Sequence, residues 1–258
     1  MITVDEVRAG LTAGEFFLVY LPTISLADGR CVGAEALIRW RRPSGVVMPD
    51  AFIPLIEETP VAGMLTYWVM ETVARELSDW LGANDDVHIS INVPPALLGR
   101  GGLEYAGTIT GLSNHRRQIV LEVTERGLPD RLGVAALDEA SKLGIRVALD
   151  DVTMARGNLA VLLRLNLDII KLDRSLISQI TPESPSPEWL VGLTALLHAT
   201  PVEVIGEGVE NEDQVEALRA CGVSMVQGYH FSRPVPVDAF KAYHARTNSQ
   251  SGQASSSV

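Results

Sequence analysis

Acidic and amide side chains recur at the ends of short apolar runs in this 258-residue chain. Five such runs end in residues of this kind: Glu35, Asn92, Glu122, the pair Asp150-Asp151, and Glu207. Several oxygen ligands without an accompanying Cys or His cluster suit Mg²⁺ or Mn²⁺ rather than zinc. Acids packed together repel one another and raise one another's pKa values, so a bound cation is the economical explanation.

Each of these stretches also has a simpler structural explanation. The pair Asp150-Asp151 could cap a following helix, and Glu207–Glu210 could form the first turn of one, where the helix dipole favours acids. Lys171 could be an exposed residue of an alternating strand. Glu35 could lie on a solvated edge strand, although a carboxylate buried without a partner is costly. The sequence has no Ser/His/Asp nucleophile pattern, GxGxxG fingerprint or Walker lysine loop.

The elements that must position these residues are short strands that alternate with helical patterns. Eight strands are expected, at Phe16–Tyr20, Val32–Trp40, Val87–Val93, Gln118–Thr124, Ile145–Asp150, Asp168–Leu172, Val202–Gly206 and Val223–Gln227. Helical patterns lie at Met64–Leu81, Val134–Leu143 and Gln214–Cys221, and a capping box at Thr3–Glu6 predicts a helix at the start. The first two strands are close enough to be antiparallel neighbours. The later alternation predicts parallel strands with crossover helices, and eight units in about 250 residues favour a closed barrel.

Side chains alternate between the two faces of a strand, so parity predicts which residues share a face. Asn92, Glu122 and Asp150 each lie opposite the aliphatic residues of their own strand, and Glu35 shares a face with Leu37 and Arg39. If the aliphatic faces pack against the helices, these polar residues point into the barrel. They lie near its C-terminal mouth, where the active sites of such barrels are built.

Composition and charge narrow the function classes. The chain has 32 acidic and 21 basic residues, a formal net charge of −11, which argues against bulk nucleic-acid binding by a basic surface. Its two cysteines, Cys31 and Cys221, fit no disulfide or zinc pattern, and no run approaches the length of a membrane span. We expect a cytoplasmic protein, with one barrel domain over residues 1–246 and a disordered tail over residues 247–258.

With these features in place, the tripeptide Glu35-Ala-Leu37 followed by Ile38-Arg39-Trp40 resembles the signature of the EAL-domain cyclic di-GMP phosphodiesterases. The resemblance covers residues 3–243. It extends to Pro49–Pro54 with Glu57–Thr59, Ile91–Val93, Leu121–Glu125, Leu149–Asp151, Ile170–Asp173, Glu207–Glu210 and Gln227–Pro234. The tripeptide alone is weak, whereas the ordered series is specific.

The resemblance implies a (β/α)8 TIM-like barrel with an antiparallel first strand. It also implies hydrolysis of cyclic di-GMP to linear pGpG, in bacterial second-messenger signalling, with two Mg²⁺ or Mn²⁺ ions and with Ca²⁺ inhibitory. The positions that match the family's metal ligands are Glu35, Asn92, Glu122, Asp150 and Asp151. Catalytic roles are implied for Glu35, Lys171 and Glu207, of which Lys171 would orient the attacking water.

Further roles follow from the same resemblance. Substrate-binding positions are Leu37, Arg39, Gln227 and Pro234, and loop-stabilising positions are Glu125 and Glu210. The resemblance also implies a homodimer. The sequence contains no sensory or diguanylate cyclase pattern, so we expect any input signal to come from assembly state or from a regulatory protein partner.

Three stretches depart from the family pattern and favour a second interpretation. Leu21-Pro-Thr23 stands where the family has Gln-Pro-Ile, Pro94 replaces a serine, and Thr153 and Ala155 replace glycines in the loop Asp150–Asn158. A side chain in place of glycine restricts backbone conformations with positive φ. The alternative function is therefore a catalytically weak or inactive module that binds cyclic di-GMP or another protein.

Overall fold

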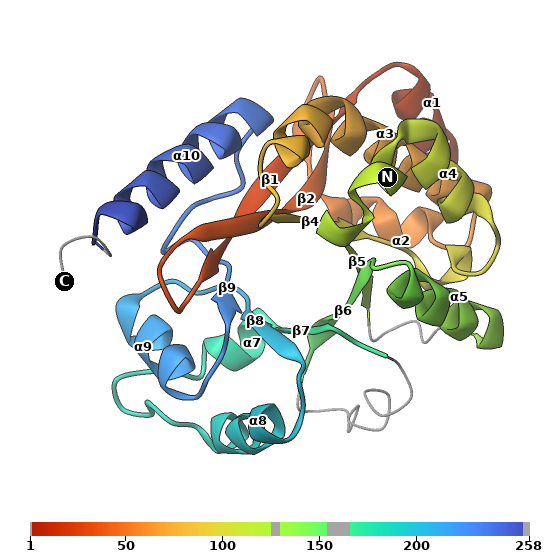
Figure 1. Cartoon of the computed structure of the whole chain (residues 1–258). Helices are drawn as coiled ribbons and strands as arrows, with labels where there is room; N and C mark the ends of the chain where they lie inside the picture. Colours follow the sequence, from red (N-terminus) through yellow and green to blue (C-terminus); the bar gives the residue numbers. More distant parts are fainter. Residues whose placement is uncertain (1, 125–129, 154–165, 255–258) are drawn as a thin grey trace.

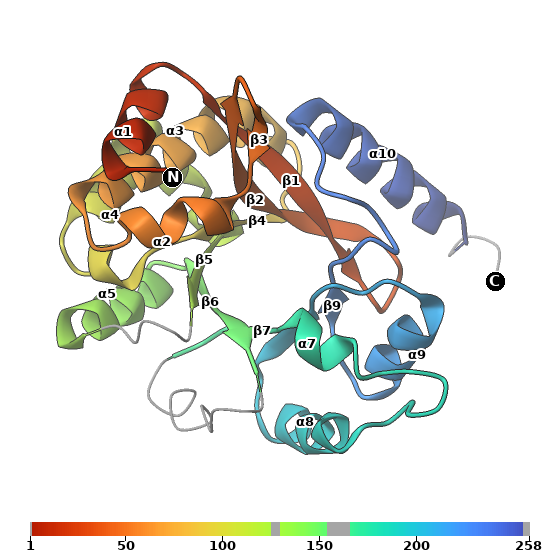
Figure 2. The same cartoon turned by 180° about the vertical axis from the view of Figure 1, so that it is seen from behind.

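The strands of this protein curl into one closed barrel, as a computed structural model shows (Figures 1 and 2). The structure describes residues 2–124, 130–153 and 166–254. Strands follow one another around the barrel in the order β1, β9, β8, β7, β6, β5, β4 and β2, and pairing of β1 with β2 completes the circle. The strand β1 runs antiparallel to both of its neighbours, and the pairs from β2 around to β9 are parallel.

The barrel strands are β1 (Phe16–Ser25), β2 (Cys31–Arg42), β4 (His88–Asn92), β5 (Ile119–Thr124), β6 (Arg146–Val152), β7 (Ile169–Leu172), β8 (Glu203–Gly206) and β9 (Met225–Val226). All eight strands expected from the sequence are confirmed, as are the barrel and its antiparallel first strand. One additional strand, β3 (Gly45–Val47), extends the sheet as a hairpin on β2 and was not predicted. Three residues are too few for an alternating pattern to be recognised.

Helices surround the barrel: α1 (Val4–Thr12), α2 (Ile53–Ile56), α3 (Pro60–Gly82), α4 (Gly102–Thr110), α5 (Arg131–Lys142), α7 (Arg174–Ile177), α8 (Glu188–Ala199), α9 (Glu212–Ala220) and α10 (Val237–Ala254). Short 3₁₀ turns lie at Pro49–Ala51, Pro95–Leu97 and Leu112–Gln118. In Figures 1 and 2, α1 to α4 gather on one side of the barrel, and α7 to α9 lie together on another. None of the described helices is long and apolar enough to cross a membrane.

Local sequence explains where the helices begin and end. At the start of α1, the Thr3 side chain accepts from the Glu6 backbone while the Glu6 side chain accepts from the Thr3 backbone, which confirms the predicted capping box. The helix α3 begins earlier than predicted because Thr59 caps it and Pro60 suits a first helical position. Beyond α5, Gly144 adopts a φ of 84°, a left-handed conformation that stops the helix as expected.

The last helix extends into the segment that composition predicts to be a disordered tail. Helix α10 continues to Ala254 and so includes most of the segment predicted to be disordered. Asn248 connects this part of the helix to β2: its Oδ1 accepts from the Cys31 N–H at 2.8 Å, and its Nδ2 donates to the Cys31 carbonyl at 3.1 Å. Phe240, stacked on Tyr20 at 5.7 Å, holds the same helix against β1. These contacts attach the helix to the first two strands, and the disordered tail stays a prediction.

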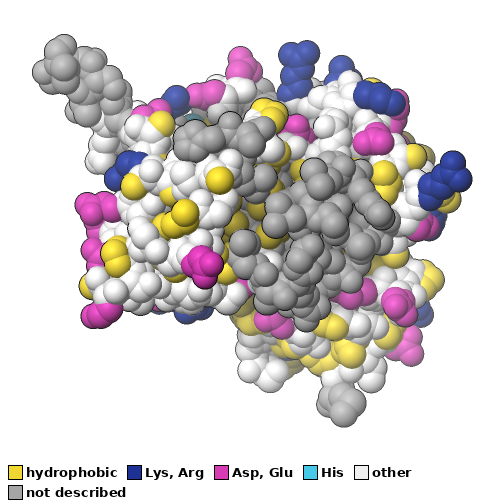
Figure 3. All heavy atoms as spheres, turned by 90° about the horizontal axis from the view of Figure 1, so that it is seen from below, with side chains coloured by type: hydrophobic (Ala, Val, Ile, Leu, Met, Phe, Trp, Pro, Cys, Tyr) yellow, Lys and Arg dark blue, Asp and Glu magenta, His cyan; other side chains and the backbone are white. Residues whose placement is uncertain are grey.

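Acidic and basic side chains are both visible on the face of the molecule shown in Figure 3. On the face shown in Figure 3, Lys and Arg side chains lie mostly near the edge, among acidic ones. This distribution of charged side chains agrees with the acidic composition.

Both cysteines are buried and free.

Candidate active site

Lys171 lies at the centre of the barrel mouth, fully buried among four carboxylates. Its Nζ is 2.7 Å from Glu207 Oε1, 2.9 Å from Glu122 Oε2, and 3.1 Å from both Glu35 Oε2 and Asp150 Oδ1. The register of neighbouring parallel strands brings these residues together, since Glu122 on β5 lies beside Asn92 on β4. Parity had predicted this inward face for Glu35, Glu122 and Asp150.

The simpler explanations of three stretches are wrong. Lys171 is not an exposed strand residue, and Glu35 is buried on a strand paired on both sides. The stretch Glu207–Glu210 precedes α9, which Asn211 caps, and so is not its first turn. Glu207 reaches the cluster from beyond the end of β8.

One ammonium group cannot satisfy this cluster. An ammonium has three N–H donors, and four carboxylates surround it. Glu122 Oε1 is buried without any partner, while Glu122 Oε2 and Asp150 Oδ1 lie near Lys171 Nζ without the geometry of a hydrogen bond. Such hard oxygen donors are what Mg²⁺ and Mn²⁺ prefer. The buried carboxylates, which share a single lysine, therefore fit a site for divalent cations.

Burial and mutual repulsion set the pKa values of the cluster. Burial, followed by the charge of Glu35, holds the pKa of Glu122 well above its usual range, and burial raises the pKa of Glu207 to about 8. Burial also raises the pKa of Asp150, against the attraction of Lys171. Glu35 behaves differently, because the charge of Lys171 and the hydrogen bond from Asn92 outweigh burial and lower its pKa. Burial alone would lower the pKa of Lys171, but the four carboxylates hold it well above the usual value.

Two amide side chains fix the orientation of the site. Asn92 Nδ2 donates to Glu35 Oε1 at 2.9 Å. Gln227 is fully buried beyond β9, and its Nε2 donates to Thr23 Oγ1 at 2.8 Å while its Oε1 has no partner. Thr23 itself belongs to one of the stretches that depart from the family pattern, and the sequence analysis did not assign it a function. Only the fold, which pairs β1 with β9, brings it beside Gln227.

A bulge in β6 brings two consecutive aspartates to the same place. The register between β6 and β7 shifts between Leu149 and Val152, and Asp151 has a φ of 57°. In a regular strand, Asp150 and Asp151 would point to opposite faces. Here, single oxygen atoms of Asp150, Asp151 and Glu207 lie within 4.8 Å of one another, and those of Glu35, Glu122 and Asp150 form a second such group. Two overlapping groups of carboxylates can thus hold neighbouring cations.

Arg39 stands on the same face of β2 as Glu35, one full alternation beyond Leu37. Its Nη1 donates to the Ile38 carbonyl at 2.8 Å, and partial burial lowers its pKa against the attraction of Tyr229 and Glu35. Tyr229 is exposed and lies under the Arg233 guanidinium, 4.4 Å from the ring centroid. Arg39, Tyr229 and Arg233 form a basic and aromatic rim. The sequence analysis gave Tyr229 and Arg233 no role, although both lie within the matched stretch Gln227–Pro234. Pro234 itself is half-buried and follows Arg233 directly.

The remaining sequence-predicted residues are not part of the cluster. Glu210 is exposed and pairs with Arg174 on α7 at 2.8 Å, so its contact is with that helix rather than with Lys171. Glu125 and the segment from Met154 to Asn158 of the altered loop lie outside the described residues. Leu37 is half-buried between the cluster and Arg39. The structure thus gathers Glu35, Asn92, Glu122, Asp150, Asp151, Lys171, Glu207 and Gln227 at the mouth.

Comparison with known proteins identifies this arrangement. Residues 4–234 match the EAL domain. A cyclic di-GMP phosphodiesterase of Pseudomonas aeruginosa, NbdA, is 34% identical over 247 residues, which cover 93% of this chain and 31% of that protein. An uncharacterized Mycobacterium tuberculosis protein is also 34% identical over 247 residues, covering 92% of this chain and 80% of its own length. Among solved structures, the PaMucR phosphodiesterase in complex with c-di-GMP is similar with a TM-score of 0.82 and 28% identity, covering 92% and 98% of the two chains. The chain belongs to the EAL domain family.

Proposed function

We propose that this protein is a metal-dependent phosphodiesterase that hydrolyses one ester of cyclic di-GMP and releases linear pGpG. The observation that carries the proposal is the buried cluster at the barrel mouth, in which four carboxylates share one lysine and Glu122 Oε1 has no partner. Relatives named as cyclic di-GMP phosphodiesterases support the choice of substrate.

The chain's own residues divide the work. Glu35, Asn92, Glu122, Asp150 and Asp151 would hold two Mg²⁺ or Mn²⁺ ions. When bound, such ions lower the pKa of a water, polarise the phosphate and stabilise the leaving oxygen. Lys171 donates from Nζ toward the attacking water and orients it, while Glu207 fixes that ammonium from 2.7 Å. Ca²⁺, which is larger and tolerates irregular coordination, would bind without supporting turnover.

Substrate binding falls to the rim. Arg39 offers its guanidinium to a phosphate, a bidentate match that also compensates the acidic cluster below it. Leu37 contributes an apolar floor to the proposed substrate site. Pro234 and Gln227 border this site on the side opposite Arg39. Tyr229, exposed beside Arg233, offers a ring face on which a guanine base can stack.

The test is hydrolysis by the purified chain in Mg²⁺ and in Mn²⁺, with products resolved by chromatography. We expect pGpG to form only with metal, and Glu35→Gln to abolish the reaction, since it removes a ligand charge and weakens the hold on Lys171. The exposed carboxylate Glu104 on α4 provides the matched control, because Glu104→Gln should leave the rate unchanged. Turnover by the Glu35→Gln variant at the rate of the unchanged chain would refute the assignment.

A second candidate function is binding of cyclic di-GMP without turnover. Thr153 stands two residues after the left-handed Asp151 where the family pattern has a glycine, and a threonine there excludes the positive-φ conformations that a glycine could adopt. Calorimetric titration with cyclic di-GMP in Ca²⁺ separates the candidates. Binding in Ca²⁺ together with intact substrate in Mg²⁺ and Mn²⁺ supports the sensor, and pGpG formation eliminates it.

We extend the proposal to a homodimer. Large apolar side chains are exposed on neighbouring helices: Tyr105 and Ile109 on α4, and Leu132 on α5. Their burial against a second copy would remove apolar surface from water. Sedimentation equilibrium of the chain and of an Ile109→Glu variant tests this, since the variant should shift the dimer toward monomer.

A further inference from the structure

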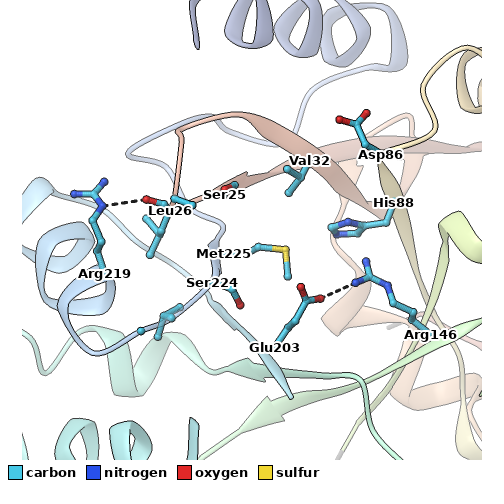
Figure 4. A pocket seen from close by; sticks show the side chains of 13 residues that line it. Ser25, Leu26, Val32, Asp86, His88, Arg146, Glu203, Arg219, Ser224 and Met225 are labelled. Carbon is cyan, nitrogen blue, oxygen red and sulfur yellow. Dashed lines mark hydrogen bonds and ion pairs between the residues drawn. The ribbon is translucent and has the colours of Figure 1, made fainter. Parts of the chain in front are cut away.

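A cavity of about 530 Å³ opens at the other end of the barrel, where the strands begin (Figure 4). His88, Arg146, Glu203 and Met225 line it, and each stands at the first position of its strand. Val120, Ala148, Ile169, Ile205 and Met225 form an apolar cluster. Ala148 and Ile205 stand two positions after Arg146 and Glu203 and two before Asp150 and Glu207, so this cluster separates the cavity from the carboxylates. The volume is in the range of small-molecule sites, and the location is remote from the proposed chemistry.

His88 is the first sign that the cavity is built for a ligand. The side chain is 4% exposed, yet its Nε2 has no hydrogen-bond partner. Burial lowers the pKa of His88 to about 3, helped by the charges of Arg146 and Lys171, so the ring is neutral at physiological pH. A buried ring nitrogen left unpaired is costly, and a molecule in the cavity that bonds to it would remove that cost.

Arg146 and Glu203 supply a second polar feature. They form an ion pair at 2.6 Å across the starts of β6 and β8, and their side chains remain 29% and 44% exposed. Figure 4 shows this pair beside His88 and Met225. The guanidinium still has N–H groups to donate and the carboxylate has lone pairs to accept, so the wall presents a donor next to an acceptor.

The charges of the lining select a neutral occupant. Anions are disfavoured by Glu203 and by Asp86, which pairs with Arg30 at the rim. Cations are disfavoured by Arg146 and by Arg219, whose Nε bonds to the Leu26 carbonyl. The apolar parts of the wall, Val32 and Met225 among them, suit a flat ring.

We propose that this cavity binds an uncharged, flat heterocycle that carries a hydrogen-bond donor beside an acceptor, the pattern on the edge of a nucleobase. Arg146 donates to the acceptor of that edge, Glu203 accepts from its donor, and His88 Nε2 bonds to another polar atom of the ring or its sugar. The proposal is independent of the proposed hydrolysis, because no residue of the carboxylate cluster takes part.

The test uses guanosine, adenosine and cytidine as uncharged probes, with ribose as the comparison, in titrations of the full chain by calorimetry and ligand-observed NMR. We expect at least one nucleoside to bind and ribose not to. Arg146→Met should weaken that binding at least about tenfold. The fold should tolerate this change because Arg146 is part-exposed and its partner Glu203 reaches solvent.

Two further variants locate the binding. Ala27→Trp, at an exposed turn position on the rim, should block entry without disturbing the core. Glu35→Gln, at the opposite end, should change the affinity less than about twofold. The proposal is overturned if no nucleoside binds in a saturable way up to about 10 mM, if ribose binds equally well, or if cyclic di-GMP in Ca²⁺ displaces the nucleoside while Arg146→Met and Ala27→Trp have no effect.

Discussion

Four carboxylates compete for the three N–H donors of the Lys171 ammonium group. This shortage of donors explains the electrostatics of the individual residues in the cluster. A buried charge is stable only when it is paired and hydrogen-bonded. Lys171 offsets part of the negative charge, and raised pKa values of Glu122, Asp150 and Glu207 reflect the rest. The folded protein therefore holds these acids together at a cost that cations can reduce.

Substitution of the central lysine measures that cost. We expect Lys171→Met to lower the free energy of unfolding by about 3 kcal/mol in chelator, because it leaves buried carboxylates without their partner. Added Mn²⁺ should restore part of the loss, since cations then supply the missing positive charge. Urea denaturation with and without metal measures both effects.

The matched control is Lys142→Met on α5, where the ion pair with Glu139 is exposed on both sides. Its effect should stay within about 0.5 kcal/mol, since such surface pairs contribute little. Equal losses in the two lysine variants would show that the buried cluster has no special dependence on Lys171.

Asp151 illustrates what sequence parity could not predict. The period-2 rule placed Glu35, Glu122 and Asp150 inside the barrel correctly, because the pairings of β2 with β4 and of β5 with β6 stay in regular register up to these residues. It would place Asp151 on the outer face, although the acidic pair and the resemblance both indicated a metal ligand there. The bulge that changes its direction depends on a left-handed residue and on pairing with β7, neither of which leaves a periodic signal.

Two substitutions of Asp151 separate the effect of its backbone conformation on stability from the effect of its carboxylate on metal binding. Asp151→Asn should leave the free energy of unfolding within about 0.5 kcal/mol, because asparagine tolerates the left-handed conformation. Asp151→Val should lower it by about 1–2 kcal/mol, because a β-branched residue at a φ of 57° is strained. Both should weaken Mn²⁺ binding in a calorimetric titration. A valine variant as stable as the asparagine variant would argue that the bulge is not strained.

At the scale of elements, the barrel strands could be predicted from the sequence, whereas the contacts that connect distant elements could not. Apolar alternation marks each barrel strand, and Gly144 marks the end of α5. The hairpin strand β3 was too short to be recognised, and α10 continues through a polar segment because Asn248 clamps the backbone of Cys31. These features depend on contacts between distant segments.

One such contact between distant segments connects the residues that follow β9 with the stretch that carries Glu207. The Val209 N–H donates to the Gln227 carbonyl at 3.0 Å, and the His230 N–H donates to the Val209 carbonyl at 3.0 Å. Gly228 lies between them, and a Cβ there would overlap the Val209 backbone. The close approach of these two backbones therefore sets the position of Glu207.

Gly228→Ala should consequently lower the free energy of unfolding by about 2–3 kcal/mol through overpacking, and reduce hydrolysis with it. Gly192→Ala on α8 is the contrasting change, since the added methyl group meets no atom within 4 Å. It should raise stability by about 0.5–1 kcal/mol, as expected for alanine in a helix. Thermal and urea unfolding of both variants check the signs, and a neutral Gly228→Ala would contradict the close packing.

For the whole molecule, His88 links stability to pH. The unfolded chain binds a proton at His88 below a pKa near 6.5, whereas the folded chain binds it only near 3. The unfolded state therefore holds more protons between these values, so this residue makes stability fall as pH falls through the window. A decrease on the order of 2–3 kcal/mol between pH 7 and pH 4 is expected from this one group.

Replacement by a residue that does not titrate removes this contribution. In urea titrations at several pH values, His88→Leu should therefore lose less stability than the unchanged chain between pH 6.5 and pH 4. Identical slopes for the two chains would mean that His88 titrates normally in the folded state.

The antiparallel first strand has a consequence for how the molecule is made. Barrel closure depends on β1 pairing with β9 at Ile24–Val226 and Ser25–Met225, and with Val235 at Tyr20. On a ribosome, β1 and β2 can form their hairpin early, but one edge of β1 stays open until β9 has been synthesised. Such long-range pairing is slow and leaves a strand edge exposed to wrong partners. Gln227 follows β9 directly and reaches its partner Thr23 only then, so the nascent chain completes this part of the barrel mouth at the moment that the open edge of β1 is paired.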